Sequence, residues 1–122
     1  MLLAEDHEDS LDALRTLLEA FGFKVYAARN GHEAVELATA HAPDLVLMDM
    51  MMPHLDGLEA TRILRASAAF RQVPIIAVTA LEGSRERVLE AGCDDLVLKP
   101  IEVRGFVDRV RAWMAAGRRP AA

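Results

Sequence analysis

Residues 44–57 read DLVLMDMMMPHLDG, and the first half of this stretch indicates the fold of the chain. From Leu45 to Met48 every side chain is apolar, so a strand built from this run has no polar face to turn toward water. Strands of this kind are typical of parallel sheets that helices cover on both sides. Asp49 follows the run directly, so a carboxylate closes this buried strand.

Short apolar runs of the same kind recur along the chain, and helical patterns separate them. They lie at 2–4, 25–28, 75–78 and 96–98. When buried strands alternate with helices, the crossovers are right-handed and place helices on both faces of the sheet. We therefore predict an α/β fold, a three-layer (βα)₅ sandwich around a five-stranded parallel sheet. The expected strand order is 2-1-3-4-5, as in flavodoxin-like folds.

The first two helices are indicated by spacing and by their end residues. Apolar residues recur at helical spacing over 11–21, and Gly22 suits the left-handed residue that ends a helix. Asn30 is expected to cap the second helix, with Glu33 reaching back to the helix start. Pro43 is expected to terminate that helix.

The later helices follow the same logic. Gly57 is expected to open the third helix, and Ser84 to cap a fourth that reaches Ala91. The fifth carries an apolar stripe of Val103, Phe106, Val107, Val110, Trp113 and Met114.

Composition restricts the class of protein. The chain has 122 residues, 52% hydrophobic and 27% charged, which is typical of one globular domain. We predict a domain over residues 1–116 and a flexible tail or linker stub over 117–122. The net charge of -5 argues against nucleic acid or an anionic membrane as partner, because clustered Lys and Arg bind both. The lone Cys93 permits no internal disulfide and the acidic start resembles no export signal, so we expect a cytoplasmic protein.

Polar residues close the predicted strands at one edge of the sheet. Glu5 and Asp6 follow the first strand, and Asp49 ends the third. Thr79 and Lys99 close the fourth and fifth strands. Ligands of open parallel sheets bind outside the carboxyl ends of the strands, where the strand order reverses. Because the first and third strands are neighbours in the expected order, three carboxylates should converge in one cleft.

Such a cluster favours a divalent cation, because carboxylates placed close together repel one another. Mg²⁺ prefers oxygen ligands and is the predicted cofactor, with Mn²⁺ as a possible substitute. Once the ion is bound, Asp49 can attack a phosphoryl donor and form an acyl phosphate. Lys99 can offset charge on the phosphoryl oxygens, and the Thr79 hydroxyl can hydrogen-bond one of them.

Four segments resemble the response-regulator receiver family of two-component signalling. They are LAED at 3–6, DLVLMDMMMPHLDG at 44–57, VTA at 78–80 and GCDDLVLKP at 92–100. The resemblance covers essentially the whole chain and implies a phosphorylatable switch. A histidine kinase or histidine phosphotransfer protein is expected to phosphorylate Asp49, after which the domain changes its binding partner. Receivers promote their own phosphorylation and dephosphorylation and are not turnover enzymes.

The resemblance also implies a ligand set for Mg²⁺. Asp6 and Asp49 are expected to bind the ion directly and Glu5 mainly through water. The backbone carbonyl of Met51 is expected to complete the protein ligands, which explains why an apolar residue can stand there.

Further expectations concern residues beside the site and the partner surface. Gly57 resembles the family's glycine after the loop that follows the third strand, and the Lys99-Pro100 bond is expected to be cis. Downstream proteins are expected to bind the face formed by the fourth helix, fifth strand and fifth helix. The expected oligomeric state is a monomer or a weak phosphorylation-dependent dimer.

Two departures from the family keep a second function open. Leu96 stands three residues before the lysine, where receivers usually carry the aromatic residue of the switch. The stretch from Thr79 to Gly92 is about two residues shorter than usual, which alters the region that begins the fourth helix. The alternative is a receiver-like binding module that works without phosphorylation. A flavin or nucleotide enzyme on this fold is disfavoured, because no glycine-rich loop follows the first strand.

Overall fold

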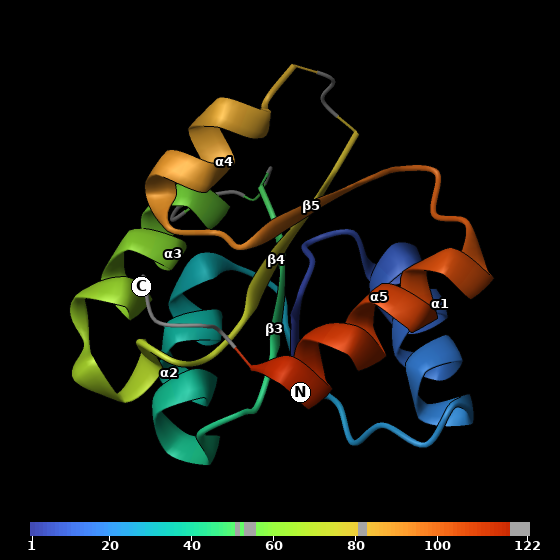
Figure 1. Ribbon diagram of the computed structural model, residues 1–122. Helices are drawn as coiled ribbons and strands as arrows, with labels where there is room; N and C mark the ends of the chain where they lie inside the picture. Colours follow the sequence, from blue (N-terminus) through green and yellow to red (C-terminus); the bar gives the residue numbers. More distant parts are fainter. Residues whose placement is uncertain (51, 53–55, 81–82, 118–122) are drawn as a thin grey trace.

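A computed structural model describes residues 1–122 except 51, 53–55, 81–82 and 118–122. Strands and helices alternate along the described part of the chain, which confirms the predicted (βα)₅ order (Figure 1). The strands are β1 (Leu2–Ala4), β2 (Tyr26–Ala28), β3 (Val46–Asp49), β4 (Ile75–Thr79) and β5 (Asp95–Leu98). The helices are α1 (Glu8–Ala20), α2 (Gly31–His41), α3 (Gly57–Ala66), α4 (Arg85–Ala91) and α5 (Val103–Ala116), with a short 3₁₀ helix η1 (Ala68–Phe70).

The five strands form one parallel sheet in the order β2-β1-β3-β4-β5, as predicted. In the register of the central strands, Ala4 lies beside Met48 and Asp49 lies beside Val78. β2 lies on one side of β1, whereas β3, β4 and β5 follow on its other side, so the strand order reverses between β1 and β3. The residues that follow β1 and those that end β3 therefore meet at the same edge, as sheets of this order require.

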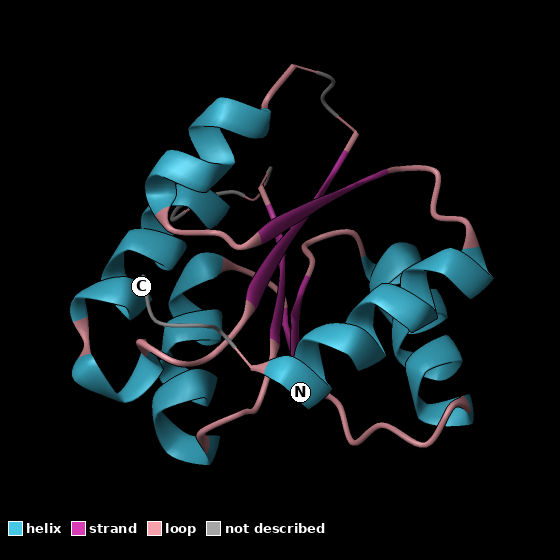
Figure 2. Cartoon of the chain, in the orientation of Figure 1, coloured by secondary structure: helices cyan, strands magenta, loops and turns pink. Residues whose placement is uncertain are grey.

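Helices cover both faces of the sheet and make the three layers visible in Figure 2. Strand residues alternate between two cores, because neighbouring side chains of a strand point to opposite faces. Leu2, Val46 and Met48 pack with α2, α3 and α4 in one core. Leu3 and Leu47 pack with α1 and α5 in the other.

Most predicted helix ends are confirmed, since the local signals act within a few residues. Gly22 adopts a left-handed φ of 93° just after α1, and the Asn30 side chain accepts a hydrogen bond from Glu33 N, 2.9 Å away. Glu33 reaches back to the helix start as expected, since its Oε1 accepts from Arg29 N at 3.2 Å. One detail differs from the prediction. Ser84 occupies the N-cap of α4 without a side-chain capping hydrogen bond.

The stripe of α5 is confirmed at its centre and wrong at its start. Phe106, Val107 and Val110 are buried, and Trp113 packs against the same core. Val103 is 44% exposed, because it begins the helix beyond the edge of that core. None of the helices in the described part of the chain combines the length and the apolar character needed to cross a membrane.

Candidate metal and phosphoryl-transfer site

Neighbouring parallel strands bring the three predicted carboxylates together. Glu5 and Asp6 follow β1, and Asp49 is the last residue of β3. One carboxylate oxygen from each lies within 4.8 Å of the other two. Glu5 and Asp49 are buried, whereas Asp6 is exposed. The cluster therefore has a buried floor and one ligand that solvent can reach.

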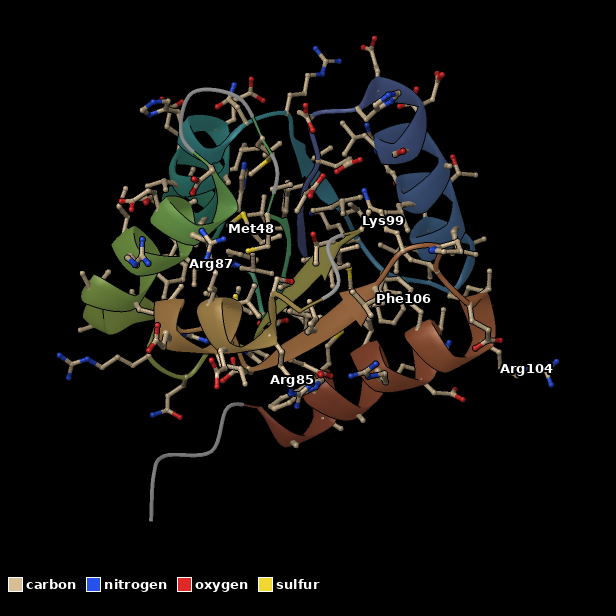
Figure 3. The ribbon with its side chains drawn as sticks, turned by 90° about the horizontal axis from the view of Figure 1, so that it is seen from above. Met48, Arg85, Arg87, Lys99, Arg104 and Phe106 are labelled. Atoms are coloured by element: carbon tan, nitrogen blue, oxygen red, sulfur yellow. The ribbon has the colours of Figure 1, made fainter. Side chains whose placement is uncertain are left out.

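Lys99 reaches this cluster from the far side of β4, and Figure 3 shows it at the carboxyl edge of the sheet. Its backbone N–H donates to the Thr79 carbonyl at 2.8 Å, which continues the ladder between β4 and β5 past Leu98. Its Nζ donates to Glu5 Oε1 at 3.1 Å and lies 3.6 Å from Asp49 Oδ2. One ammonium group thus pairs with two carboxylates that come from different strands.

Burial and mutual repulsion alter the proton affinity of Glu5. Burial, a hydrogen bond to Asp49 and the charge of Asp49 together raise the pKa of Glu5 to about 7 against the opposing effect of Lys99. Burial lowers the pKa of Lys99, but its contacts with Glu5 and Asp49 outweigh that effect and leave the pKa above its usual value. With all three carboxylates ionised, the site carries two negative charges more than the lysine compensates, and protonation of Glu5 reduces this excess to one.

The same geometry fits a hard divalent cation. Glu5 Oε2 is buried and has no hydrogen-bond partner among the residues that the structure describes. A buried carboxylate oxygen without a donor is costly, and a cation removes that cost. The donor atoms are all oxygens, as Mg²⁺ prefers. Glu5, Asp6 and Asp49 can thus hold the ion, while Met51, predicted to add a carbonyl, lies outside the described residues.

The structure also describes four further residues that the sequence singled out. A Cβ on Gly57 would lie only 2.1 Å from the backbone oxygen of Asp49, so only glycine lets α3 start against the end of β3. The Lys99-Pro100 bond is cis, as expected. Leu96 is buried in the core beneath α4, and Thr79 is fully buried at the end of β4.

Sequence reasoning missed the pairing between Lys99 and Glu5. We predicted that the Lys99 ammonium group offsets charge on phosphoryl oxygens and that Glu5 binds the metal ion mainly through water. In this structure the two side chains form an ion pair with each other. The pair spans 94 residues of sequence, so no local pattern could have indicated it. Met50 and Met52 are buried in the core that contains residues of α2, α3 and α4.

Comparisons with known proteins agree with this arrangement. The family model described as the response regulator receiver domain matches residues 1–111. The polar-differentiation response regulator DivK of Brucella anthropi is 39% identical over 116 residues, which cover 93% of this chain and 94% of that protein.

Solved receiver domains share the fold over nearly their whole length. The receiver domain of a sensor histidine kinase from Pseudomonas aeruginosa, solved with a magnesium ion coordinated in its active-site cleft, has 37% identity and a TM-score of 0.87. That comparison covers 93% of this chain and 95% of the other. The signal receiver domain of a histidine kinase from Syntrophus aciditrophicus has 32% identity and a TM-score of 0.88, covering 99% of this chain and 93% of the other. The chain therefore belongs to the response regulator receiver family of two-component signalling.

Proposed function

We propose that this receiver domain accepts a phosphoryl group on Asp49 in a Mg²⁺-dependent reaction. The observation that carries the proposal is the position of Asp49, which ends β3 between a lysine ammonium group and two other carboxylates. A carboxylate oxygen can act as the nucleophile, and the Lys99 ammonium group lies 3.6 Å from Asp49 Oδ2.

The transfer step moves the phosphoryl group between two nucleophiles. An oxygen of the Asp49 carboxylate attacks phosphorus in line, and the bond between phosphorus and the donor atom breaks. With a phosphohistidine donor the electron pair of that bond stays on the imidazole nitrogen, so the products are an acyl phosphate and a free histidine. Lys99 is already held beside Asp49, and it offsets negative charge on the phosphoryl oxygens.

Asp6 and Asp49 would hold the Mg²⁺ ion directly and Glu5 mainly through water, with the Met51 carbonyl as a further ligand. When bound, the ion supplies positive charge next to the phosphoryl oxygens. A sensor-kinase receiver with 37% identity coordinates magnesium in its cleft, which supports the same metal for this chain. Mn²⁺ prefers the same oxygen donors and could substitute.

Thr79 and Leu96 belong to the response that follows phosphorylation. We propose that the Thr79 hydroxyl, at the buried end of β4, hydrogen-bonds the phosphoryl group and so couples it to the start of α4. Leu96 of β5 stands where receivers usually carry the aromatic residue of the switch. The coupling in this chain therefore does not use a rotamer change of an aromatic side chain. Water later attacks the acyl phosphate and resets the domain, which makes the reaction self-limited and not a turnover of external substrate.

The partners follow from the donor chemistry. We propose that a histidine kinase or a histidine phosphotransfer protein supplies the phosphoryl group. A downstream protein then binds the face of α4, β5 and α5, where Leu89 and Leu98 are exposed.

The test is intact-mass spectrometry of the whole chain after incubation with acetyl phosphate, with Mg²⁺ or with EDTA. We expect the mass of one phosphoryl group to be gained with Mg²⁺ and not with EDTA. Asp49→Asn should abolish the gain. Asp44→Asn is the matched control, because Asp44 is an exposed aspartate just before the same strand. A gain that persists in Asp49→Asn would refute the acceptor, and no gain in any sample would favour the phosphorylation-independent module.

A further inference from the structure

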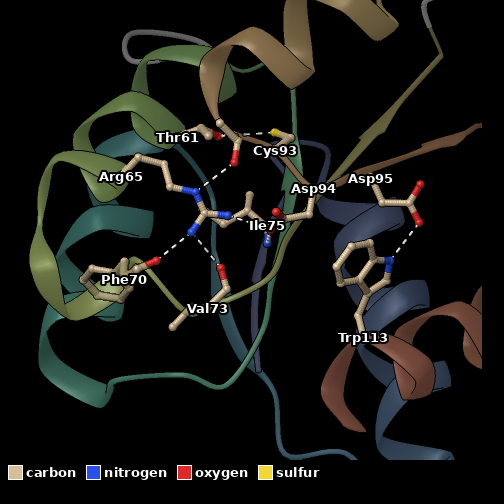
Figure 4. A network of polar contacts seen from close by, with 10 residues as sticks. Thr61, Arg65, Phe70, Val73, Ile75, Cys93, Asp94, Asp95 and Trp113 are labelled. Atoms are coloured by element: carbon tan, nitrogen blue, oxygen red, sulfur yellow. Dashed lines mark hydrogen bonds and ion pairs between the residues drawn. The ribbon is translucent and has the colours of Figure 1, made fainter. Parts of the chain in front are cut away.

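The Arg65 side chain joins three segments beside the starts of β4 and β5 (Figure 4). Because all the strands are parallel, this edge of the sheet is opposite the carboxylate cluster. Arg65 lies near the end of α3, and its side chain is only 10% exposed. Its Nη2 pairs with Asp94 Oδ2 at 2.6 Å, and its Nε donates to the Gly92 carbonyl at 2.8 Å. Both partners belong to the turn between α4 and β5, so this ion pair ties α3 to the end of α4.

The same guanidinium also holds the turn before β4. Its Nη1 donates to the carbonyls of Phe70 and Val73 at 2.6 and 2.7 Å. Asp94 continues the network, because its Oδ2 accepts from Ile75 N at 2.9 Å and its own N–H donates to Ile75 O at 2.8 Å. A planar guanidinium suits such convergent acceptors, and an ammonium group cannot reach all of them.

Gly92 closes α4 directly against this arginine. Its φ of 117° is left-handed, and a Cβ there would lie 2.6 Å from Arg65 Cγ. The amides of Gly92 and Cys93 donate to the carbonyls of Leu89 and Val88, the double closure known as a Schellman motif. The end of α4 is therefore closed by its own backbone and covered by Arg65.

The two ends of α4 are held unequally. Its buried residues, Val88 and Ala91, lie in the second half of the helix. Its first three residues, which include Arg85 and Arg87 in Figure 3, are exposed. That exposed end is the one nearer in sequence to Thr79, the last residue of β4.

We propose that Arg65, Gly92 and Asp94 form a fixed pivot for α4. A change around Thr79 then moves the first turn of the helix while the last turn stays in place. Segments with few buried side chains open at low free energy, whereas disrupting a buried ion pair is costly. The inference deepens the proposed function, since it names the element that phosphorylation of Asp49 would move and the point about which it turns.

Amide hydrogen exchange of the whole chain, measured residue by residue by NMR, tests the pivot in the unmodified protein. Val88 N donates to Ser84 O and Cys93 N donates to Val88 O, so both amides are hydrogen-bonded reporters of the two ends. We expect Cys93 to exchange at least about tenfold more slowly than Val88. Equal exchange at the two ends would overturn the pivot.

Two arginines of α3 provide a matched pair of variants. Arg65→Gln should speed exchange at Gly92 and Cys93 by about tenfold or more. Arg62→Gln should leave both amides unchanged, because Arg62 is half exposed and pairs with Glu59, one turn before it on α3. If Arg65→Gln does not fold, Asp94→Asn serves instead, because it keeps an acceptor for Ile75 N while removing the charge. Exchange at Gly92 and Cys93 that equals wild type in the folded variant would overturn the proposal.

A second arm adds acetyl phosphate and Mg²⁺, with intact mass recorded on the same sample. We expect amide shift changes at residues 85–88 and little change at 92–94, and we expect the change to spread to 92–94 in Arg65→Gln. A uniform change across α4 in the wild type would overturn the pivot. If no phosphoryl group is gained, the proposed function fails, while the exchange measurements on the unmodified protein still decide the pivot.

Discussion

Replacing Glu5 with glutamine should stabilise the metal-free protein at neutral and alkaline pH. Glu5 is buried beside Asp49, and its pKa stands at about 7 instead of near 4.5. Glutamine has nearly the same shape, can accept from Lys99, and can donate to Asp49 through its amide. The variant thus keeps the contacts of protonated Glu5 and cannot acquire the charge that the fold disfavours.

The size of the effect follows from proton linkage. A carboxyl group whose pKa is raised on folding contributes stability that is fully present below pH 4.5 and is lost as the pH rises through about 7. A tenfold change in proton affinity corresponds to about 1.4 kcal/mol, so ionising Glu5 in the folded protein costs about 3 kcal/mol. The stability difference between Glu5→Gln and wild type should therefore widen by about 2.5 kcal/mol between about pH 5 and pH 8.

Urea unfolding in EDTA, repeated across this pH range, measures the difference. Trp113 is the only tryptophan and its Nε1 donates to Asp95 Oδ2 at 3.0 Å, so its fluorescence reports the loss of packing between β5 and α5. Parallel pH profiles for the two proteins would refute the argument, because they would show that Glu5 ionises normally in the fold. Added Mg²⁺ should reverse the ranking at about pH 8, since the ion interacts with the charged carboxylate of the wild type and not with the neutral amide.

Four other substitutions test the Gly57 contact, the charge of Lys99 and the burial of α3. Gly57→Ala should cost about 3 kcal/mol or more, because its Cβ would lie 2.1 Å from the Asp49 backbone oxygen; an unchanged urea midpoint would contradict that contact. Lys99→Met should tighten Mg²⁺ binding by up to about tenfold in calorimetry, because it removes a positive charge that competes for the same carboxylates; weaker binding would count against this view. Leu64→Ala should lower the free energy of unfolding by about 2–5 kcal/mol and Ile63→Ala by less than about 1 kcal/mol, because Leu64 is 2% exposed and Ile63 is 44% exposed; similar losses would show that burial does not decide these positions.

Local sequence patterns predicted the strands and helices well where the interactions that form them involve residues close together in the sequence. The apolar runs form strands of this sheet because a strand whose side chains are apolar on both faces must be covered on both faces. Their ends shifted by a residue, as at β5, which begins at Asp95 and not at Leu96. An aspartate is unfavourable in a strand, but Arg109 and Trp113 of α5 bind this carboxylate from outside the strand.

The sequence by itself determined the strands, the helices between them and the identity of the residues at the carboxyl edge of the sheet. The strand order was expected from flavodoxin-like folds and is confirmed by the structure. Hydrophobic periodicity and right-handed crossovers are local rules, and parallel strands bring their ends to one edge whatever the side chains do there. Only the tertiary structure decided which of those residues touch. The pairing of Lys99 with Glu5 and the Arg65 network both join segments that lie far apart in sequence. The raised pKa of Glu5 likewise depends on burial and on Asp49, which belongs to another strand. Distances and desolvation set these interactions, and neither exists until the chain has packed.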